Sequence, residues 1–455
     1  MKKNNLIYTY LLAVSFLFGM GACDTLDQEP VNQIPTDEAI TNARSAERAI
    51  LGMYDGMQSE NYYGLRYLYY QDTYTDNLQH AGTFTTDQEV SFRRINPSNL
   101  QIRSTWQTMY RVIRDANFIL FSLSNLDDAT EEQLLAYEAE ARFIRAYVYY
   151  DLLRVFNGVP LVTDFVTTVD EINTLPRAST EDLYAFIIAE LQFAEQNLGE
   201  TPDAPFRARP AAATAMLARV HLQAGNPGQA AQKATEAIGL GYSLLPNYRD
   251  IWTIPGNAEM IFNLSFTNVD GDQSALAISS DPDTGGQKFY IREDFFNQFA
   301  ASAAEGDTRF EASITLEFIA DRVFRRVFKY YRSATNDDNV PLIRLAEMYL
   351  IRAEAIVRQG SVTAQVITDI NTIRNRAGLV SLTGLASPAA ALTEIQRQRR
   401  FELAFEGHRY SDMRRFGNIG TLFPDNEQFR VIWPIPLQEI EVNPNLEQNP
   451  GYTAE

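Results

Sequence analysis

Residues 399–417, RRFELAFEGHRYSDMRRFG, combine many charged side chains with many large apolar ones. A solvated helix face would not need so many apolar groups, and an ordinary core helix would not need so many charges. Charges that leave water must be paired and hydrogen-bonded. The stretch therefore predicts a buried or half-buried ion network that locks one helix end onto several neighbours. Its apolar members are Phe401, Leu403, Phe405, Tyr410, Met413 and Phe416.

Glu402 and Glu406 lie one helical turn apart in this stretch. A pair of carboxyl groups forms the catalytic groups of glycoside hydrolases. However, Arg399, Arg400 and Arg409 crowd them in the sequence. Nearby cations favour the ionised carboxylate and lower its pKa, whereas a general acid needs a raised pKa. The stretch is therefore expected to be structural.

The remaining residues offer no better catalytic or metal site. The three histidines, His80, His221 and His408, are widely separated and lack the spacing of zinc ligands or of a catalytic triad. Asp270 and Asp272 could join a calcium site, but the twelve-residue calcium-loop pattern is absent, which favours a solvated loop. We expect no enzyme activity, no cofactor and no metal.

The amino-acid composition limits which classes of partner the chain can bind. Its 455 residues carry a formal net charge of −19, so nucleic acid would be repelled. Hydrophobic residues make up 45% and aromatic residues 12%, which is ample material for a core. Such an acidic surface suits a domain that handles neutral ligands.

The first residues have the organisation of an export signal. Two lysines precede an apolar run, residues 6–20, and two small residues then lead to Cys23, the only cysteine. The run is too short for a stable membrane-spanning helix. Residues 1–22 thus look like a bacterial lipoprotein signal that leaves Cys23 acylated. The alternative is a secretory signal with an incidental cysteine.

Residues 23–35 are acidic and contain proline without any periodicity, which predicts a flexible tether. Residues 36–455 are expected to form one domain, with helical periodicity beginning at Thr36. A helix pair is clearest at residues 211–224 and 229–240, where alanines allow the close approach of tetratricopeptide pairs. A second pair is expected to begin with Pro341 as its first helical residue and to run to Ala377.

Two regions, residues 61–99 and 265–339, do not follow the helical period. The first holds a cluster of tyrosines and then polar loop material. The second reads as an irregular insertion, with a strand or extended segment at residues 322–331. Near the C-terminus, WPIP at residues 433–436 is expected to be extended, since a residue before proline avoids the helical region.

Four stretches resemble the SusD/RagB-like outer-membrane lipoproteins, and they occur in the order of that family. They are residues 342–355 (LIRLAEMYLIRAEA), 371–379 (NTIRNRAGL), 399–417 and 433–452 (WPIPLQEIEVNPNLEQNPGY). Cys23, the Asp76–Asn77 pair, and Trp106 with Tyr110 also fit the family pattern. The resemblance thus runs from the signal to the C-terminus.

The resemblance implies a fold and a function. The fold would be mainly α, with about four tetratricopeptide-like helix pairs, a loop-rich irregular insertion and few short strands. The protein would be lipid-anchored at the cell surface in the outer membrane, and would act as a lid on a SusC-like TonB-dependent transporter. Its cargo would be an oligosaccharide or polysaccharide, although some members serve peptide uptake. Members of the family are binding proteins without hydrolytic activity.

Sugar recognition needs exposed aromatic platforms together with planar polar groups, and binding residues concentrate on loops held by a rigid scaffold. Two regions have this mixture, residues 77–94 and 266–331. For any single aromatic residue there, packing against its own loop is the alternative. The candidate ligand residues are Asn77, His80, Phe84, Phe92, Arg93, Asp270, Phe289, Tyr290, Arg292 and Tyr331.

We therefore expect a glycan-capturing surface lipoprotein. Peptide capture is the alternative within the family. A tetratricopeptide adaptor without a small ligand is the alternative from another class.

Overall fold

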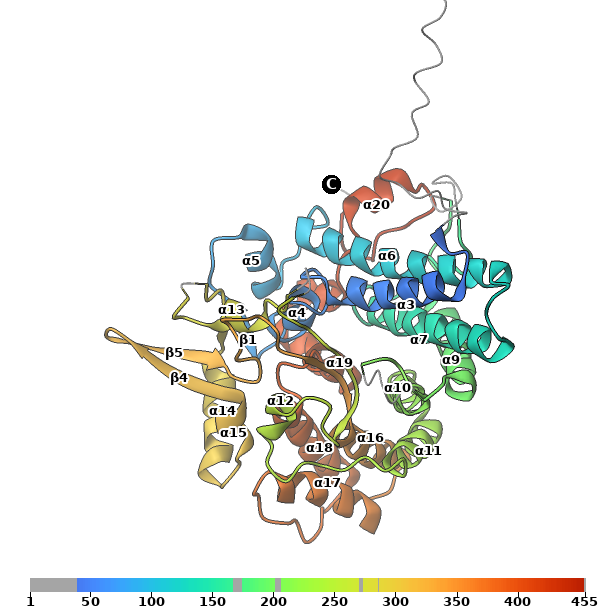
Figure 1. Ribbon diagram of the computed structural model, residues 1–455. Helices are drawn as coiled ribbons and strands as arrows, with labels where there is room; N and C mark the ends of the chain where they lie inside the picture. The colour runs from blue at the N-terminus through green and yellow to red at the C-terminus, as the bar shows by residue number, and fades with distance from the viewer. Residues whose placement is uncertain (1–38, 167–173, 201–205, 270–272, 285, 454–455) are drawn as a thin grey trace, which may run out of the picture.

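The computed structural model describes residues 39–166, 174–200, 206–269, 273–284 and 286–453. Four helix pairs follow one another and form most of the body, as expected (Figure 1). Each pair packs on the next: α6 lies against α7, α9 against α10, and α11 against α16. The pairs are α3 (Ala43–Gln58) with α6 (Leu100–Ser122), α7 (Glu131–Phe156) with α9 (Thr180–Asn197), α10 (Pro210–Gln223) with α11 (Pro227–Ile238), and α16 (Leu345–Arg358) with α17 (Ala364–Arg376).

Local sequence explains where several of these helices begin. Asn42 and Ser45 form a reciprocal capping box at the start of α3, and Thr130 and Gln133 form another at the start of α7. The alanine-rich face of α10 is buried against the small side chains of α11, so the two helices approach closely. No helix in the described part of the chain combines the length and the apolarity needed to cross a membrane.

The described strands form three small antiparallel sheets of two strands each. In the first, His80 lies opposite Phe289, and in the third, Phe318 lies opposite Val323. The third sheet is a hairpin that extends from the body at the left of Figure 1. The sheets are β1 (Leu78–His80) with β3 (Phe289–Ile291), β2 (Met260–Leu264) with β6 (Val340–Arg344), and β4 (Ile314–Ile319) with β5 (Arg322–Val327).

The expectation that Pro341 begins a helix is wrong. Residues 340–344 form strand β6, which is buried along its whole length, and α16 begins only at Leu345. The pairing of β6 with β2 outweighs the helical spacing of the apolar residues, because a buried strand and a buried helix share the same local composition.

The two regions without helical period contain more regular structure than expected. Residues 61–99 include helices α4 (Arg66–Thr73) and α5 (Thr85–Ser91), and the tyrosines around α4 are buried in the core. Residues 265–339 include α14 (Glu293–Ala304), although the segment at residues 322–331 does contain the expected strand. The other short elements are η1 (Leu123–Asn125), α12 (Asp250–Thr253), α13 (Leu276–Ser280), α15 (Arg309–Ser313), η2 (Ile419–Leu422), η3 (Asp425–Val431) and α20 (Leu437–Val442).

The ion network predicted from residues 399–417 is confirmed. Helix α18 (Pro388–Glu402) ends at Glu402, a tight turn follows, and α19 (Arg409–Arg415) begins after it. The guanidinium of Arg344 donates to Glu259 (2.6 Å), Glu402 (3.1 Å) and Glu406 (2.7 Å), and all four side chains are buried. Further bonds run from Arg376 to Glu259 and Glu402, from Lys329 to Glu406, and from Arg309 to Glu402.

The C-terminal segment closes the core. Residues 433–436 have no regular secondary structure, as expected for WPIP. Trp433 is fully buried and meets the rings of Tyr74 and Phe156 edge-on at 5.9 and 6.0 Å between centroids. Asn449 donates to the carbonyl oxygens of Trp433 (2.8 Å) and Phe156 (3.1 Å), so the chain end is tied to the helical body.

Candidate functional site

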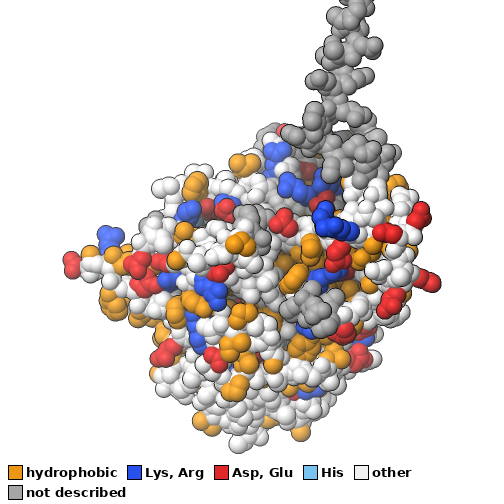
Figure 2. Space-filling view, viewed as in Figure 1, with side chains coloured by type: hydrophobic (Ala, Val, Ile, Leu, Met, Phe, Trp, Pro, Cys, Tyr) orange, Lys and Arg blue, Asp and Glu red, His pale blue; other side chains and the backbone are white. Residues whose placement is uncertain are grey.

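Exposed aromatic side chains belong to the residues that flank α5 and to β4, the elements at the left of Figure 1. In the same view, Figure 2 shows hydrophobic side chains at the surface on this side. These elements adjoin one another, because α5 contacts β1, β1 pairs with β3, and β3 contacts β5. Phe84 and Phe92 flank α5 and are 54% and 66% exposed, and Phe318 in β4 is 75% exposed. Tyr290 in β3 is half-buried. We call Phe84, Phe92, Tyr290 and Phe318 the aromatic side.

Phe84 lies beside a cation. The Nζ of Lys288 is 5.3 Å from the centroid of the Phe84 ring, which is cation–π distance. The backbone around Lys288 is held by hydrogen bonds from Ala81 N to Lys288 O (3.0 Å) and from Lys288 N to Ser279 O (2.8 Å). An apolar ring and a flexible hydrogen-bond donor therefore stand together on a fixed backbone.

Phe92 is displayed by a sharp corner at the end of α5. Arg93, the next residue, has a φ of 60°, which is uncommon for a residue with a side chain. Its Nη2 donates to Thr75 O (2.7 Å), and Arg292 Nη2 donates to Ser91 O (3.0 Å), so the corner is held from both sides. Held in this way, Phe92 can stay exposed on a rigid backbone.

Arg292 is engaged inside the fold. Besides its bond to Ser91, its Nε donates to Leu78 O (2.7 Å). Burial lowers the pKa of this guanidinium to about 10. Arg292 and Arg93, both predicted as ligand residues, thus hold the backbone that carries Phe92.

Three of the predicted ligand residues are buried and do not form part of the exposed surface. Asn77 donates to Asp72 (2.6 Å) and accepts from Arg400 (3.0 Å), so its amide is used within the fold. His80 and Phe289 face each other across the β1–β3 sheet with ring centroids 5.2 Å apart, and burial lowers the pKa of His80. The sequence does not distinguish these positions from exposed ones, because segments distant in the chain, which include Arg400, β1 and β3, cover them.

The two predicted tyrosines lie in different surroundings. Tyr290 donates its hydroxyl to Gln287 O (3.3 Å) and keeps part of its ring exposed. Tyr331 is half-buried, with the guanidinium of Arg249 4.4 Å from its ring centroid. Asp270 lies outside the described residues.

The β4–β5 hairpin adds an apolar surface that sequence reasoning missed. Phe318 and Val323 are opposite each other and both exposed, and the partly exposed Leu316 lies two residues before Phe318 on the same face. The guanidinium of Arg325, opposite Leu316, lies 4.2 Å from the Phe296 ring centroid. The signal was the alternation of apolar and polar residues along Leu316, Glu317 and Phe318.

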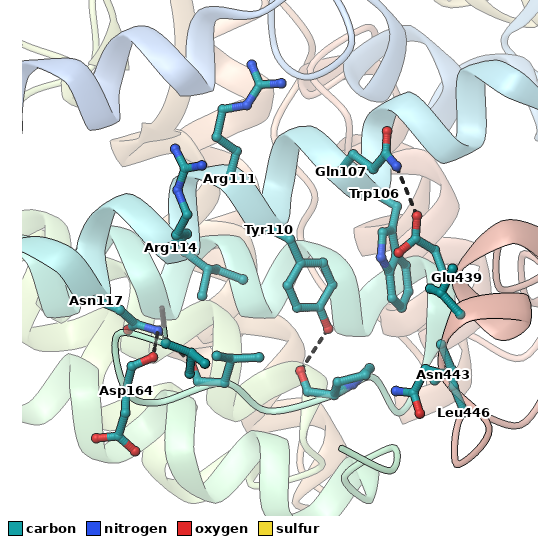
Figure 3. Close-up of a pocket in the computed structure, with 15 residues that line it drawn as sticks. Trp106, Gln107, Tyr110, Arg111, Arg114, Asn117, Asp164, Glu439, Asn443 and Leu446 are labelled. Atoms are coloured by element: carbon teal, nitrogen blue, oxygen red, sulfur yellow. Dashed lines mark hydrogen bonds between the residues drawn. The ribbon is translucent and has the colours of Figure 1, made fainter. Parts of the chain in front are cut away.

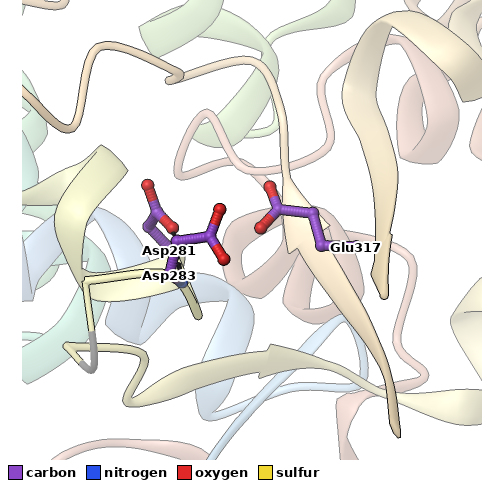
Figure 4. A group of neighbouring side chains, drawn as sticks. All are labelled: Asp281, Asp283 and Glu317. Carbon is purple, nitrogen blue, oxygen red and sulfur yellow. Dashed lines mark hydrogen bonds between the residues drawn. The ribbon is translucent and has the colours of Figure 1, made fainter. Parts of the chain in front are cut away.

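Three carboxylates near this hairpin, those of Asp281, Asp283 and Glu317, lie close enough to share a cation (Figure 4). However, Arg326 Nη1 already lies 3.1 Å from Asp281 Oδ2 and 2.9 Å from Glu317 Oε1. The guanidinium supplies the positive charge between these two, so the cluster needs no metal ion to account for its geometry.

The paired carboxylates of residues 399–417 are unsuited to acid catalysis. Both Glu402 and Glu406 are buried in the ion network. Although burial alone would raise the pKa of Glu402, the charges of Arg376, Arg344, Arg309 and Lys329 lower it to about 2. A carboxyl group that stays ionised cannot donate a proton near neutral pH.

Two family models match the chain. One, described as the SusD family, matches residues 290–427, and one described as starch-binding and associating with the outer membrane matches residues 24–222. SusD-like protein P25 of Formosa agariphila is 24% identical, and the alignment covers 99% of both chains. The starch-binding protein SusD of Bacteroides thetaiotaomicron is 27% identical over 73% of this chain and 76% of that protein.

Solved structures share the fold. A laminarin-binding SusD-like protein superposes with a TM-score of 0.80 at 26% identity, covering 91% of this chain and 100% of the other. A SusD superfamily protein from Bacteroides vulgatus superposes with a TM-score of 0.79 at 24% identity and the same coverage. The helix pairs and the small sheets are therefore a known architecture.

Proposed function

Because the chain belongs to the SusD/RagB-like family, we propose that it captures an oligosaccharide or polysaccharide at the outer membrane and passes it to a SusC-like TonB-dependent transporter. The observation that supports glycan binding is the aromatic side, where Phe84, Phe92 and Phe318 are exposed. Hydrogen bonds hold the backbone beside Phe84 and Phe92. Aromatic faces pack against the C–H faces of sugars and lose little conformational entropy on binding.

Neutral glucans are the first ligands to test. The relatives named above are described as binding starch and laminarin, and both polymers consist of uncharged glucose units. The net charge of −19 favours an uncharged glycan over an anionic one, since like charges repel.

The proposal also includes delivery of the cargo to the transporter and anchoring of the protein at the membrane. We expect the long face of the helix pairs to be the surface that contacts the transporter. Acylation of Cys23, which lies outside the described residues, would hold the protein at the membrane. The protein binds its cargo without cleaving it, and the burial of Glu402 and Glu406 supports this.

Affinity electrophoresis and calorimetry with laminarin and soluble starch test the glycan proposal. Phe84→Ala, Phe92→Ala and Tyr290→Ala should each weaken binding by about three- to tenfold, the worth of one aromatic contact. Phe121→Ala is the matched control, because Phe121 is equally exposed (60%) but lies on α6, and it should bind like the unaltered protein.

Other results would contradict the proposal. A protein that ignores every glycan and copurifies with mixed peptides would be a peptide-capturing lid. One that binds neither ligand and still captures a large membrane protein would be an adaptor. Release of reducing ends from a polysaccharide would show hydrolysis.

A further inference from the structure

A pocket of about 300 Å³ lies between α6, the segment at residues 160–166, and the region of α20 (Figure 3). None of its lining residues belongs to the aromatic side. Its volume is at the lower end of the range for small-molecule sites.

The surface inside the pocket is mainly apolar. Trp106 and Tyr110 stand one turn apart on α6 with ring centroids 4.9 Å apart. Val162, Val442 and Leu446 complete the walls from the other two segments. This surface suits an aromatic ring or a short aliphatic chain.

The polar groups of the walls are mostly used within the protein, which disfavours a sugar as the ligand. A sugar hydroxyl needs free donors and acceptors, and their absence is costly in a buried site. The internal bonds run from Tyr110 Oη to Pro160 O (2.7 Å), from Asn117 Nδ2 to Val162 O (3.0 Å) and Asp164 O (3.1 Å), from Gln107 Nε2 to Glu439 Oε1 (3.0 Å), and from Asn443 Nδ2 to Leu175 O (2.8 Å).

Two exposed arginines at the edge retain free donors. Arg111 makes no hydrogen bond or ion pair with any residue in the described part of the chain. Arg114 uses Nε and Nη2 on Asp115, which leaves Nη1. Of the two wall carboxylates, Glu439 is bonded to Gln107, and that of Asp164 points away from Tyr110 (Figure 3). Glu439 Oε1 also lies 4.0 Å from Arg103 Nε. The free hydrogen-bond donors at the edge therefore belong to cationic side chains.

We propose that this pocket is a second binding site, which takes a small organic acid. The apolar body of the ligand lies against Trp106 and Tyr110. Its carboxylate pairs with Arg111 and Arg114, whose exposed side chains point away from Tyr110 in Figure 3 and turn toward the ligand when it binds. Guanidinium groups suit this role, because their fork of donors matches a carboxylate.

A matched pair of probes tests the charge requirement. Isothermal titration of the full chain with 4-phenylbutyrate should show one site. The neutral 4-phenylbutanamide should bind at least about tenfold more weakly, because it lacks the charge-assisted hydrogen bonds. Equal affinity of the two probes, or no binding of the acid at millimolar concentration, would overturn the proposal.

Variants locate the site. Val442→Glu places a carboxylate in the wall and should abolish binding of the acid. Val442 is 55% exposed, so the change should leave folding intact. Val380→Glu, at a valine 80% exposed elsewhere, should bind normally. Unchanged binding by Val442→Glu would place the probe outside this pocket and overturn the proposal.

The two arginines have their own control. Arg111→Gln combined with Arg114→Gln should reduce the affinity for the acid to that for the amide. Arg48 is an exposed arginine on α3, and Arg48→Gln should leave the affinities for both probes unchanged. Laminarin retardation should be the same in all these variants, so failure of this site and failure of glycan capture are distinguishable.

Discussion

Arg344 lies at the centre of the buried ion network. Its guanidinium contacts Glu259, Glu402 and Glu406, which come from two distant parts of the chain. Removing it would leave three buried carboxylates with only Arg376, Lys329 and Arg309 to compensate them. Unpaired buried charge is among the most costly defects in a protein interior.

Arg344→Met should therefore lower the free energy of unfolding by about 3–5 kcal/mol, measured by urea denaturation. Methionine retains much of the side-chain volume, so the loss of stability would measure the effect of removing the guanidinium charge. Arg48→Met at an exposed position should change stability by less than about 0.5 kcal/mol. A loss as small as this for Arg344→Met would show that the network is dispensable.

The network also predicts how stability depends on pH. The pKa of Glu402 and that of Asp412 are each lowered to about 2, the first mainly by Arg376 and the second mainly by Arg399, against the effect of burial. Each of these carboxyl groups binds fewer protons in the folded protein than in the unfolded chain. Its contribution to folding stability is therefore complete above the unfolded pKa, near 4, and is lost as pH falls towards 2.

Asp72 acts in the opposite sense, because burial raises its pKa to about 6. As pH falls, Asp72 takes up a proton in the folded protein at a higher pH than in the unfolded chain. Its protonation therefore stabilises the folded protein as pH falls from 6 to about 4. The urea concentration at the unfolding midpoint should therefore stay nearly constant between pH 6 and 4.5 and fall steeply below about pH 4. A midpoint that declined steadily from pH 6 would contradict the assignment.

At the scale of single elements, the end of α17 depends on one glycine. Gly378 follows the helix with a φ of +83°, which L residues rarely adopt. A Cβ there would lie 2.7 Å from the carbonyl oxygen of Gly306. Thr308 N donates to Ala377 O (2.9 Å), so this helix end is packed on the turn before α15.

Gly378→Ala should destabilise the protein by about 1–3 kcal/mol, through backbone strain and the close contact. Gly384→Ala is the matched control, because Gly384 has open space and no positive φ, and it should be neutral or slightly stabilising. Thermal or urea unfolding of both variants measures the difference. Equal stability would mean that the helix end can shift at no cost.

At the scale of the whole molecule, one continuous core joins residues from Ile40 to Leu446. It includes side chains from the sheets that carry the aromatic side and from α3, α6, α7, α9, α10, α11 and α16. The buried apolar side chains of α17 belong to smaller clusters beside it. The aromatic side is therefore part of the same folded body as the scaffold.

Cys23→Ala tests the anchoring of this body. The variant should lose incorporation of labelled fatty acid and disappear from the outer-membrane fraction, because its tether would no longer carry lipid. Its affinity for laminarin should be unchanged, since Cys23 precedes the described body. Retention of the variant in the membrane fraction, with lipid still attached, would show that another residue is acylated.

The helical scaffold, the presence of an ion network and the resemblance to the SusD/RagB-like family could all be predicted from the sequence. Helical spacing of apolar residues is a local property, so α10, α11 and α17 could be predicted within a few residues. Charges embedded among large apolar groups must be paired wherever they are buried, so residues 399–417 indicated a network without naming its partners. The exposed positions of Phe84 and Phe92 agree with the candidate surface.

Which positions form strands, and which side chains are accessible, became clear from the folded structure. Residues 340–344 form a strand because β2, far earlier in the chain, pairs with them. Asn77, His80 and Phe289 are buried because distant segments cover them, whereas Phe318 is exposed because its hairpin extends from the body. The pocket beside Trp106 is likewise formed by three segments that are separate in sequence. Burial depends on contacts between distant residues, and local patterns do not specify those contacts.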